Sequence, residues 1–336
     1  MSNTDHNAEG RKGDHIEMAF RSVVSSDELD SRFYYEPLMQ AHPSEQRLET
    51  TFCGKLLRIP LWVSSMTGGT AKARLINANL ARACAEFGMG MGLGSCRALL
   101  TSKDAHADFD VRDIIGPDLP LFGNLGIAQI EQLIAKKQLD LIDGLHDRLQ
   151  LDGLIVHVNP LQEAFQPEGD RFAKAPLDSI AQLIADASYP IIVKEVGQGM
   201  GRSSLEALLK LPLAALDFAA AGGTNFAQLE LLRNQDKTAL SPLVRVGHSA
   251  VDMVSMVNEL IFQLGSEVQC RQLIVSGGVR DFLDGYYLIN KVQLPAVYGQ
   301  ASGFLRHAQG DYAQLQAHIQ TQAEGLSLAN AYLKIK

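Results

Sequence analysis

The sequence predicts an α/β protein folded as a (β/α)8 TIM barrel with an N-terminal extension. Three observations predict it. Eight short apolar runs alternate with stretches of helical periodicity, the apolar runs end in polar or glycine residues, and 336 residues suit a single large barrel. We expect residues 1–55 to form the extension, folding over or beside the barrel mouth, and residues 56–336 to form the barrel.

The predicted strands are continuous apolar runs, as is typical of parallel strands buried on both faces. In chain order they are 61–65 (LWVSS), 89–93 (MGMGL), 119–124 (LPLFGN), 153–159 (GLIVHVN), 190–195 (PIIVKE), 213–218 (LAALDF), 272–277 (QLIVSG) and 295–300 (PAVYGQ). Helical periodicity between them predicts helices at 71–87, 127–137, 177–187 and 204–211. We interpret 226–248 as a long loop, and such loops are often functional lids.

Polar residues follow nearly every predicted strand. The endings read MTGG, GSCR, NLG, HVNPLQE, KEVGQG, GGTN, SGGV and GQASG. A doubly wound sheet would concentrate its site at one switch point, whereas a barrel builds its site from all the carboxyl ends of its strands. The sequence therefore predicts an active site at the carboxyl-terminal face of a barrel.

Composition excludes several classes of function. A formal net charge of −8 and a pI near 5.6 argue against general binding to nucleic acid or anionic membranes. No apolar run approaches the roughly 20 residues that cross a bilayer, and the polar first residues do not form a secretory signal. Four scattered cysteines without a CxxC pair argue against zinc and a disulfide framework. We expect a cytoplasmic protein.

Glycine pairs end the last three predicted strands, in Gly222-Gly223-Thr224, Ser276-Gly277-Gly278 and the run 299–303. Glycine allows the backbone to approach a phosphate closely and to direct several N–H groups at it. Tight turns between strands and helices are the alternative explanation for one such pair. Three successive pairs favour a bound phosphate of a cofactor, at the place where barrels often bind one.

Lys194 ends an apolar strand run, so we expect it inside the barrel mouth, where a buried charge needs a reason. Two functions remain open: a Schiff-base lysine, or a cation beside the negative charge of a cofactor such as a reduced flavin. A structural salt bridge to Glu195 or to a neighbouring carboxylate is a weaker alternative.

His157 and Asn159 lie two residues apart on a predicted strand and therefore share one face. Gln162 and Glu163 follow in the loop, and Glu163 offers the hard oxygen ligand that Mg²⁺ prefers. Arg97, at the end of the second predicted strand, is placed to bind an anion. A lone strand histidine is usually a core residue, but four polar residues converging at one strand end favour a binding site.

These motifs together are similar to those of the type 2 isopentenyl-diphosphate isomerases, over nearly the whole chain. The segments that carry the resemblance are RKGDHI (11–16), SSMTGGT (64–70), GLGSCR (92–97), NLG (124–126), HVNPLQE (157–163), VKEVGQGM (193–200), AAGGTN (220–225) and SGGV (276–279). Each run alone is weak, and their combination in this order is highly specific.

The resemblance implies an FMN-dependent enzyme that interconverts isopentenyl and dimethylallyl diphosphate. It implies Mg²⁺, a reduced flavin supplied with electrons by NAD(P)H, proton transfer without net redox change near the flavin N5, and a homo-oligomer of four or more copies. By motif, the residues implied to contact FMN or its phosphate are Met66, Thr67, Ser95, Asn124, Lys194, Thr224, Gly277, Gly278, Ala301 and Ser302. Those implied to bind the small diphosphate substrate are Arg11, Lys12, His15, Arg97, His157, Asn159 and Gln162, with Glu163 on the metal.

Two alternatives share the barrel. An FMN-dependent oxidoreductase acting on 2-hydroxy acids typically has a catalytic histidine closely followed by an arginine after a late strand, but His248 is followed by SAV. The second alternative is a ligand-binding barrel that has lost its enzymatic activity. The chain departs from the family pattern at Gly201, at Asn225-Phe226 and in the run RDFLD after SGGV.

Overall fold

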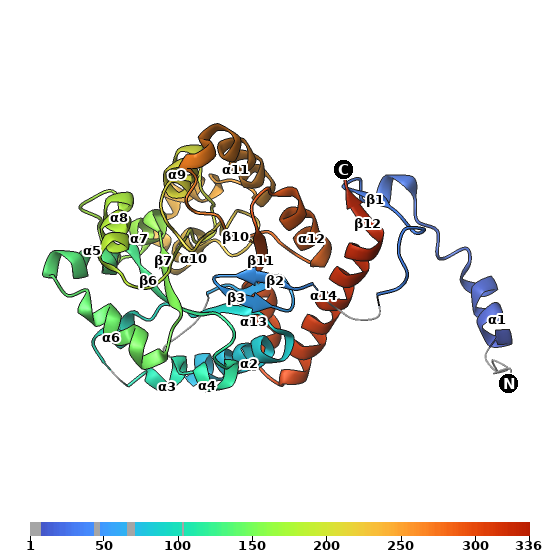
Figure 1. The fold of residues 1–336 in the computed structure, drawn as a ribbon, viewed down its shortest axis with the longest axis horizontal. Helices are drawn as coiled ribbons and strands as arrows, with labels where there is room; N and C mark the ends of the chain where they lie inside the picture. The colour runs from blue at the N-terminus through green and yellow to red at the C-terminus, as the bar shows by residue number, and fades with distance from the viewer. Residues whose placement is uncertain (1–7, 44–47, 66–70, 103) are drawn as a thin grey trace.

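The computed structural model describes residues 8–43, 48–65, 71–102 and 104–336. Within them, eight parallel strands close into a barrel in chain order, as predicted from the alternation of apolar runs (Figure 1). The barrel strands are β4 (Leu61–Val63), β5 (Gly90–Gly92), β6 (Leu121–Gly126), β7 (Gly153–His157), β8 (Ile191–Lys194), β9 (Ala215–Asp217), β10 (Leu273–Ser276) and β11 (Ala296–Gln300). Each coincides with one predicted run.

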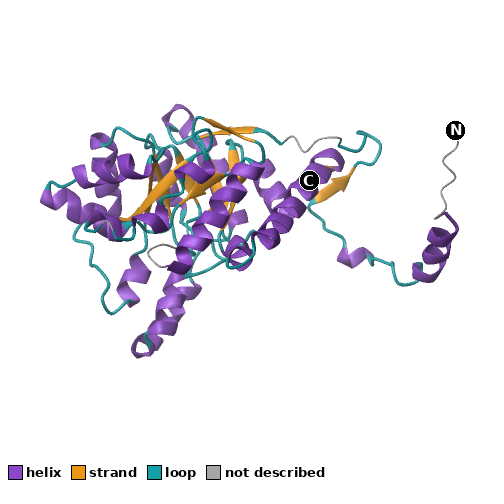
Figure 2. Ribbon diagram, turned by 90° about the horizontal axis from the view of Figure 1, so that it is seen from below, coloured by secondary structure: helices purple, strands orange, loops and turns teal. Residues whose placement is uncertain are grey.

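Helices surround this barrel (Figure 2). They are α2 (Ala71–Phe87), α3 (His106–Phe109), α4 (Arg112–Ile115), α5 (Ile127–Lys136), α6 (Asp140–Leu149), α7 (Pro160–Phe165), α8 (Pro176–Asp186), α9 (Arg202–Leu209), α10 (Phe226–Arg233), α11 (Ala250–Leu264), α12 (Phe282–Lys291), α13 (Ser302–Ala308) and α14 (Tyr312–Tyr332). Short 3-10 turns are η2 (Arg97–Leu100), η3 (Gln235–Arg245) and η4 (Gly265–Glu267). None of the described helices is long and apolar enough to span a membrane.

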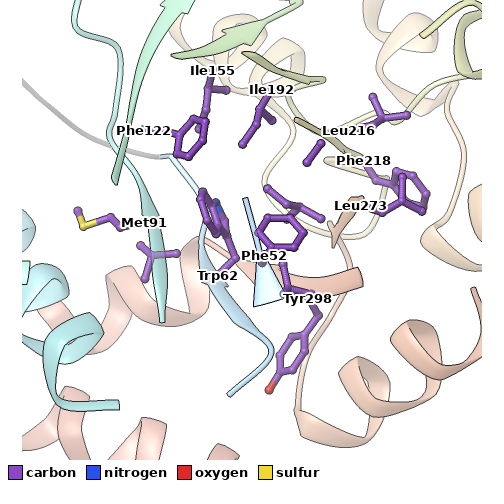
Figure 3. Close-up of a cluster of buried hydrophobic side chains, with 14 of the residues drawn as sticks. Phe52, Trp62, Met91, Phe122, Ile155, Ile192, Leu216, Phe218, Leu273 and Tyr298 are labelled. Carbon is purple, nitrogen blue, oxygen red and sulfur yellow. The ribbon is translucent and has the colours of Figure 1, made fainter. Parts of the chain in front are cut away.

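Large aromatic side chains fill the interior of the barrel (Figure 3). Trp62 is fully buried and packs edge-on against Phe122, with ring centroids 5.9 Å apart. Gly90 on the neighbouring strand makes room for the indole, since a Cβ there would lie 2.2 Å from Trp62 Cζ3. The glycines of the run MGMGL are therefore a packing requirement of the core. Burying such a ring contributes about 1.5–3 kcal/mol to folding.

A β-hairpin closes the amino-terminal end of the barrel. Its strands are β2 (Thr50–Phe52) and β3 (Lys55–Leu57), and the Phe52 ring lies 5.7 Å from that of Trp62. The Cys53 N–H donates to Gln272 Oε1 and the Lys55 ammonium donates to the Pro117 carbonyl, both of which precede barrel strands. The hairpin therefore lies at the face opposite to the carboxyl ends of the strands.

The remainder of the N-terminal segment makes its described contacts beside α14, at the C-terminus of the chain. Strand β1 (Phe33–Tyr35) pairs antiparallel with β12 (Leu333–Ile335), and Arg32 forms an ion pair of 2.8 Å with Asp284. Helix α1 (Ala8–Met18) stands apart from the barrel in both views (Figures 1 and 2). That this extension folds over or beside the barrel mouth stays a prediction.

The stretch 226–248 is not the long loop that we predicted from the sequence. It contains helix α10 and the 3-10 run η3. The Asn225 carboxamide caps α10 by accepting a hydrogen bond from the Gln228 N–H at 2.9 Å. Ala227 and Leu231 then pack with Phe165 in a small cluster outside the main core. The sequence pattern failed here because this helix packs on α7, outside the main barrel core.

Candidate active site

Three polar side chains occupy one row at the carboxyl end of the barrel. In strand register, His157 on β7 pairs with Lys194 on β8, and Lys194 pairs with Asp217 on β9. Residues in register on adjacent parallel strands direct their side chains to the same face. The row lies two residues along each strand from buried apolar residues such as Ile155 and Ile192. A polar layer thus begins where the apolar core ends.

His157 is held by a side chain from the neighbouring strand. Its Nδ1 lies 2.6 Å from Oδ1 of the buried Asn124 on β6. An amide oxygen only accepts, so Nδ1 carries the proton and Nε2 is left with a lone pair. Burial and, to a smaller extent, the charge of Lys194 together lower the pKa of His157 to about 3. The imidazole is therefore neutral at physiological pH.

Lys194 is buried, with only 6% of its surface exposed to solvent, and its ammonium donates to the Glu195 carbonyl at 2.6 Å. The salt bridge to the Glu195 carboxylate, considered above as an alternative, is not formed. That carboxylate instead accepts the N–H groups of Gly197, Gln198 and Gly199 at 2.6, 2.6 and 3.0 Å. Glu195 thus fixes the loop after β8, while the Lys194 charge stays at the barrel mouth.

Two further polar residues of this layer, Asp217 and Ser276, were not singled out from the sequence. Asp217 is completely buried, and its Oδ1 accepts hydrogen bonds from the Ser276 hydroxyl and from the Ala219 N–H. Burial raises the pKa of Asp217, while the Lys194 charge opposes the shift. Its Oδ2 has no hydrogen-bond partner among the described residues. An aspartate inside an apolar strand run was the signal that could have identified it.

Gln162 and Glu163 do not lie in a loop, as we predicted, but in helix α7, which begins at Pro160 directly after its N-cap residue Asn159. Their side chains form a hydrogen-bonded chain with that of Asn159. The Asn159 amide donates to Gln162 Oε1 at 3.1 Å and to Glu163 Oε1 at 3.0 Å. The other oxygen of the buried Glu163 accepts the Asp170 N–H at 2.8 Å, and the Asp170 carboxylate pairs with Arg97 at 3.2 Å. The structure thus brings together four residues that were predicted to bind substrate and metal.

Across the mouth, the glycine loops line a cavity of about 390 Å³. Gly277 has a φ of +86°, and a Cβ there would lie 2.0 Å from the Ala220 carbonyl oxygen. Only glycine fits this position without displacing the backbone. The four predicted phosphate contacts, Gly277, Gly278, Ala301 and Ser302, all line this cavity, as does the predicted FMN contact Thr224.

The other predicted site residues are distributed as follows. Ser95 is exposed in the loop after β5. Lys12 and His15 are exposed on α1, which the structure does not bring to the other site residues. Arg11 belongs to α1, but its side chain lies outside the description, and Met66 and Thr67 lie outside the described residues.

The four cysteines are free, and three of them are buried. Burial raises the pKa of Cys96 and Cys270 to about 12, so their thiols stay protonated and unreactive. They therefore take no part in the chemistry of the site.

Relatives among known proteins share this chain nearly end to end. An isopentenyl-diphosphate delta-isomerase of Rickettsia felis is 35% identical over 327 residues, which is 95% of this chain and 90% of the relative. The Rickettsia typhi protein of the same name is 33% identical, over 95% and 91%. The chain belongs to the isopentenyl-diphosphate delta-isomerase family. The family predicted from the sequence motifs is confirmed, although no family model matches the chain.

Solved structures confirm the fold of this isopentenyl-diphosphate delta-isomerase family member. A mandelate oxidase variant with an FMN monooxide adduct matches with a TM-score of 0.56 at 14% identity, covering 91% of this chain and 88% of that one. A flavocytochrome b2 variant with pyruvate bound matches with a TM-score of 0.61 at 13% identity, covering 94% and 78%. At such low identity the likeness concerns the barrel alone.

Proposed function

We propose that this protein interconverts isopentenyl diphosphate and dimethylallyl diphosphate, using FMN in its reduced form, Mg²⁺, and NAD(P)H as the reductant. One observation carries the proposal: the shared motifs NLG, HVNPLQE and VKEVGQGM meet in one polar layer at the barrel mouth. Beside it, the shared motifs AAGGTN and SGGV line a glycine-rich cavity. The polar layer and the cavity lie at the carboxyl-terminal face of the barrel, where barrel enzymes have their active sites.

The residues at the mouth fit FMN. Ser64 Oγ and Asp217 Oδ2 are buried without described partners, as expected of polar groups that contact a bound molecule. Backbone N–H groups of the loops around Gly277 would hold the phosphate, and Lys194 would lie beside the ring system. When bound, the reduced flavin supplies the acid and base that add and remove the proton on the allylic carbons.

Mg²⁺ fits this site only together with the substrate. Glu163 supplies one buried carboxylate, and the described residues contain no cluster of three or more side chains able to hold a metal. Magnesium commonly keeps one or two protein carboxylates and completes its shell with phosphate oxygens and water. We therefore expect Mg²⁺ to bind through Glu163 and the diphosphate.

The charges at the mouth explain why further cations are needed. His157 is neutral and brings no charge to a diphosphate, and Arg97 is already paired with Asp170. Asn124 fixes the His157 ring, so that Nε2 accepts a hydrogen bond in one defined orientation. With α1 at a barrel mouth, Arg11, Lys12 and His15 would supply additional donors. Arg97, Asn159 and Gln162 would contact the same substrate.

The decisive experiment is an anaerobic assay. The purified protein is given NADPH, Mg²⁺ and isopentenyl diphosphate, and the products are followed by NMR. We expect dimethylallyl diphosphate to form without stoichiometric consumption of NADPH. Stoichiometric oxidation of NADPH would support the FMN-dependent oxidoreductase instead. A flavin spectrum without any turnover would point to a barrel that has lost activity.

We also propose a cytoplasmic homo-oligomer of four or more copies, in which α1 and the segment after it pack on another copy. Large apolar side chains there are exposed to solvent in the single chain: Phe20 by 90%, Val23 by 76% and Leu38 by 92%. A surface of this kind is typical of a contact with a partner.

Two substitutions test this part of the proposal. We expect Phe20→Ser to lower the mass of the assembly measured by light scattering. We expect Lys12→Ala to raise the KM for isopentenyl diphosphate about tenfold, because one charged hydrogen bond to the substrate is lost, while FMN still binds. Phe262→Ser, on the exposed face of α11, is the matched control for the first. Unchanged kinetics of Lys12→Ala would remove α1 from the active site.

A further inference from the structure

The glycine-lined cavity is also lined by basic side chains, and these do not belong to its glycine motifs. Its ionisable lining residues in the described chain are Arg280, Arg306, His307 and His318, with no carboxylate among them. The whole chain carries a formal net charge of −8, so this concentration of basic residues is local. A cavity of this composition favours an anion.

Two of these residues form a stacked pair between the last two helices. The ring centroids of His307 on α13 and His318 on α14 lie 4.4 Å apart, with an angle of 19° between the ring planes. The edge of the Phe304 ring packs against His318 at 6.1 Å. Parallel stacking at this distance would be unfavourable for two protonated rings without an anion nearby.

A buried network fixes the orientation of His318. The Gln322 amide nitrogen donates to Gln300 Oε1 at 2.8 Å and lies 3.3 Å from His318 Nε2, while Gln322 Oε1 accepts the Tyr298 hydroxyl at 3.0 Å. The Gln300 amide in turn donates to the Val279 carbonyl, in the loop after Gly278.

This network also sets the tautomer of His318. The Gln322 nitrogen can only donate, so His318 Nε2 accepts and the proton lies on Nδ1. That Nδ1–H has no hydrogen-bond partner among the described residues. Burial lowers the pKa of His318, and the neighbouring His307 and Arg306 lower it further. The ring is thus a neutral donor, held rigidly against the loops after β10 and β11.

We propose that His307 and His318 bind the phosphate of the flavin, and so form a second, side-chain half of the phosphate site opposite the glycine loops. This inference rests on the proposed function, because it assumes that the cavity takes FMN. It assigns to α14, far along the chain from the family motifs, a direct part in cofactor binding. The run RDFLD, which follows the SGGV motif, departs from the family pattern. The histidine pair would add phosphate contacts beside this altered run.

The test compares two flavins that differ only in the phosphate. Apoprotein is titrated with FMN and with riboflavin, and binding is followed by the quenching of flavin fluorescence. We expect His318→Ala to weaken FMN binding roughly ten- to a hundredfold, the usual effect of losing a hydrogen bond to a charged group. Riboflavin binding should stay within about twofold of the unsubstituted protein, since less than roughly 0.5 kcal/mol is involved.

Two further variants complete the experiment. His307→Ala removes the stacked ring without disturbing the Gln322 network, so it remains informative if His318→Ala folds poorly. His146→Ala is the control. His146 lies on α6, and its ring also stacks on another ring, that of Tyr189, with centroids 4.9 Å apart, but it does not line the cavity.

The outcomes separate the two proposals. Unchanged FMN affinity in both cavity variants, or an equal loss for FMN and riboflavin, would overturn the phosphate role of the pair while leaving the enzyme assignment intact. Failure of the unsubstituted protein to bind FMN would instead remove the proposed cofactor itself.

Discussion

The two halves of the barrel mouth are built differently. On the side of β6, β7 and β8, the site consists of buried polar side chains, including Asn124, His157 and Lys194. The His157 Nδ1–H donates to Asn124 and the Lys194 ammonium donates to the Glu195 carbonyl. On the side of β9, β10 and β11, the loops are glycine-rich and the backbone itself forms the wall of the cavity.

The difference fits the two tasks that the proposed function assigns to this barrel face. Backbone N–H groups bind a phosphate whatever the protonation state of the protein, provided that no Cβ intrudes. Orienting a substrate and stabilising charge require particular side chains in a low-dielectric environment. We therefore expect substitutions on the first side to reduce catalysis, and substitutions on the second side to reduce cofactor binding and stability.

Lys194→Gln should have the largest effect, because it removes the buried cation from the side-chain half. We expect kcat to fall about 10²–10³-fold, the usual loss for one preorganised electrostatic group. Stopped-flow assays of the FMN-loaded variant would measure it. Lys210→Gln, at an exposed ion pair with Glu206, is the control. A kcat within a factor of two of the unsubstituted enzyme would refute the role of Lys194 in catalysis.

Glu163→Gln should come next, with about a hundredfold loss of turnover and a much weaker Mg²⁺ dependence. The amide oxygen can still accept the Asp170 N–H, so the loop should stay folded. A Mg²⁺ titration of the initial rate measures the effect. Glu168→Gln, exposed in the turn that follows α7, serves as the control. Full Mg²⁺-dependent turnover in Glu163→Gln would exclude it as the metal ligand.

Gly277→Ala probes the backbone half. The new Cβ would meet the Ala220 carbonyl at 2.0 Å in a left-handed conformation, so we expect a loss of about 1–3 kcal/mol of unfolding free energy and weaker FMN binding. Chemical denaturation and flavin titration measure the two effects. At Gly303 in the same cavity, the nearest atom to a Cβ lies 3.4 Å away, so Gly303→Ala should be tolerated. Equal behaviour of the two variants would contradict the close-approach requirement.

The smallest effect concerns pH. The folded-state pKa of His157 is about 3, below its ordinary value of 6.5, so below pH 6.5 the unfolded chain binds a proton that the folded protein does not. Stability from this group is therefore complete above pH 6.5 and is lost as the pH falls toward 3, by at most about 1.4 kcal/mol per pH unit. Unfolding free energies measured from pH 7 to pH 5 should show this slope, and His157→Gln should reduce it. The control substitution His15→Gln, at an exposed position on α1, should leave this slope unchanged.

Much of the fold followed from local pattern. Every barrel strand coincides with a predicted run, and α2 has the bounds that periodicity indicated. The predicted loop at 226–248 was wrong because α10 packs outside the main core and is stabilised by its contacts with α7. The loop predicted for Gln162 and Glu163 was wrong because Pro160 begins a short helix directly after Asn159.

The sequence by itself determined the order of strands and helices, the face on which the polar residues gather and the family, because strand length, helical period and short motifs are local properties. The tertiary structure decided which side chains meet. The Asn124–His157 bond joins residues 33 apart in the chain, and the Arg97–Asp170 pair joins residues 73 apart. Only closure of the barrel, which places adjacent strands in register and packs α14 against α13, brings such groups within hydrogen-bonding distance.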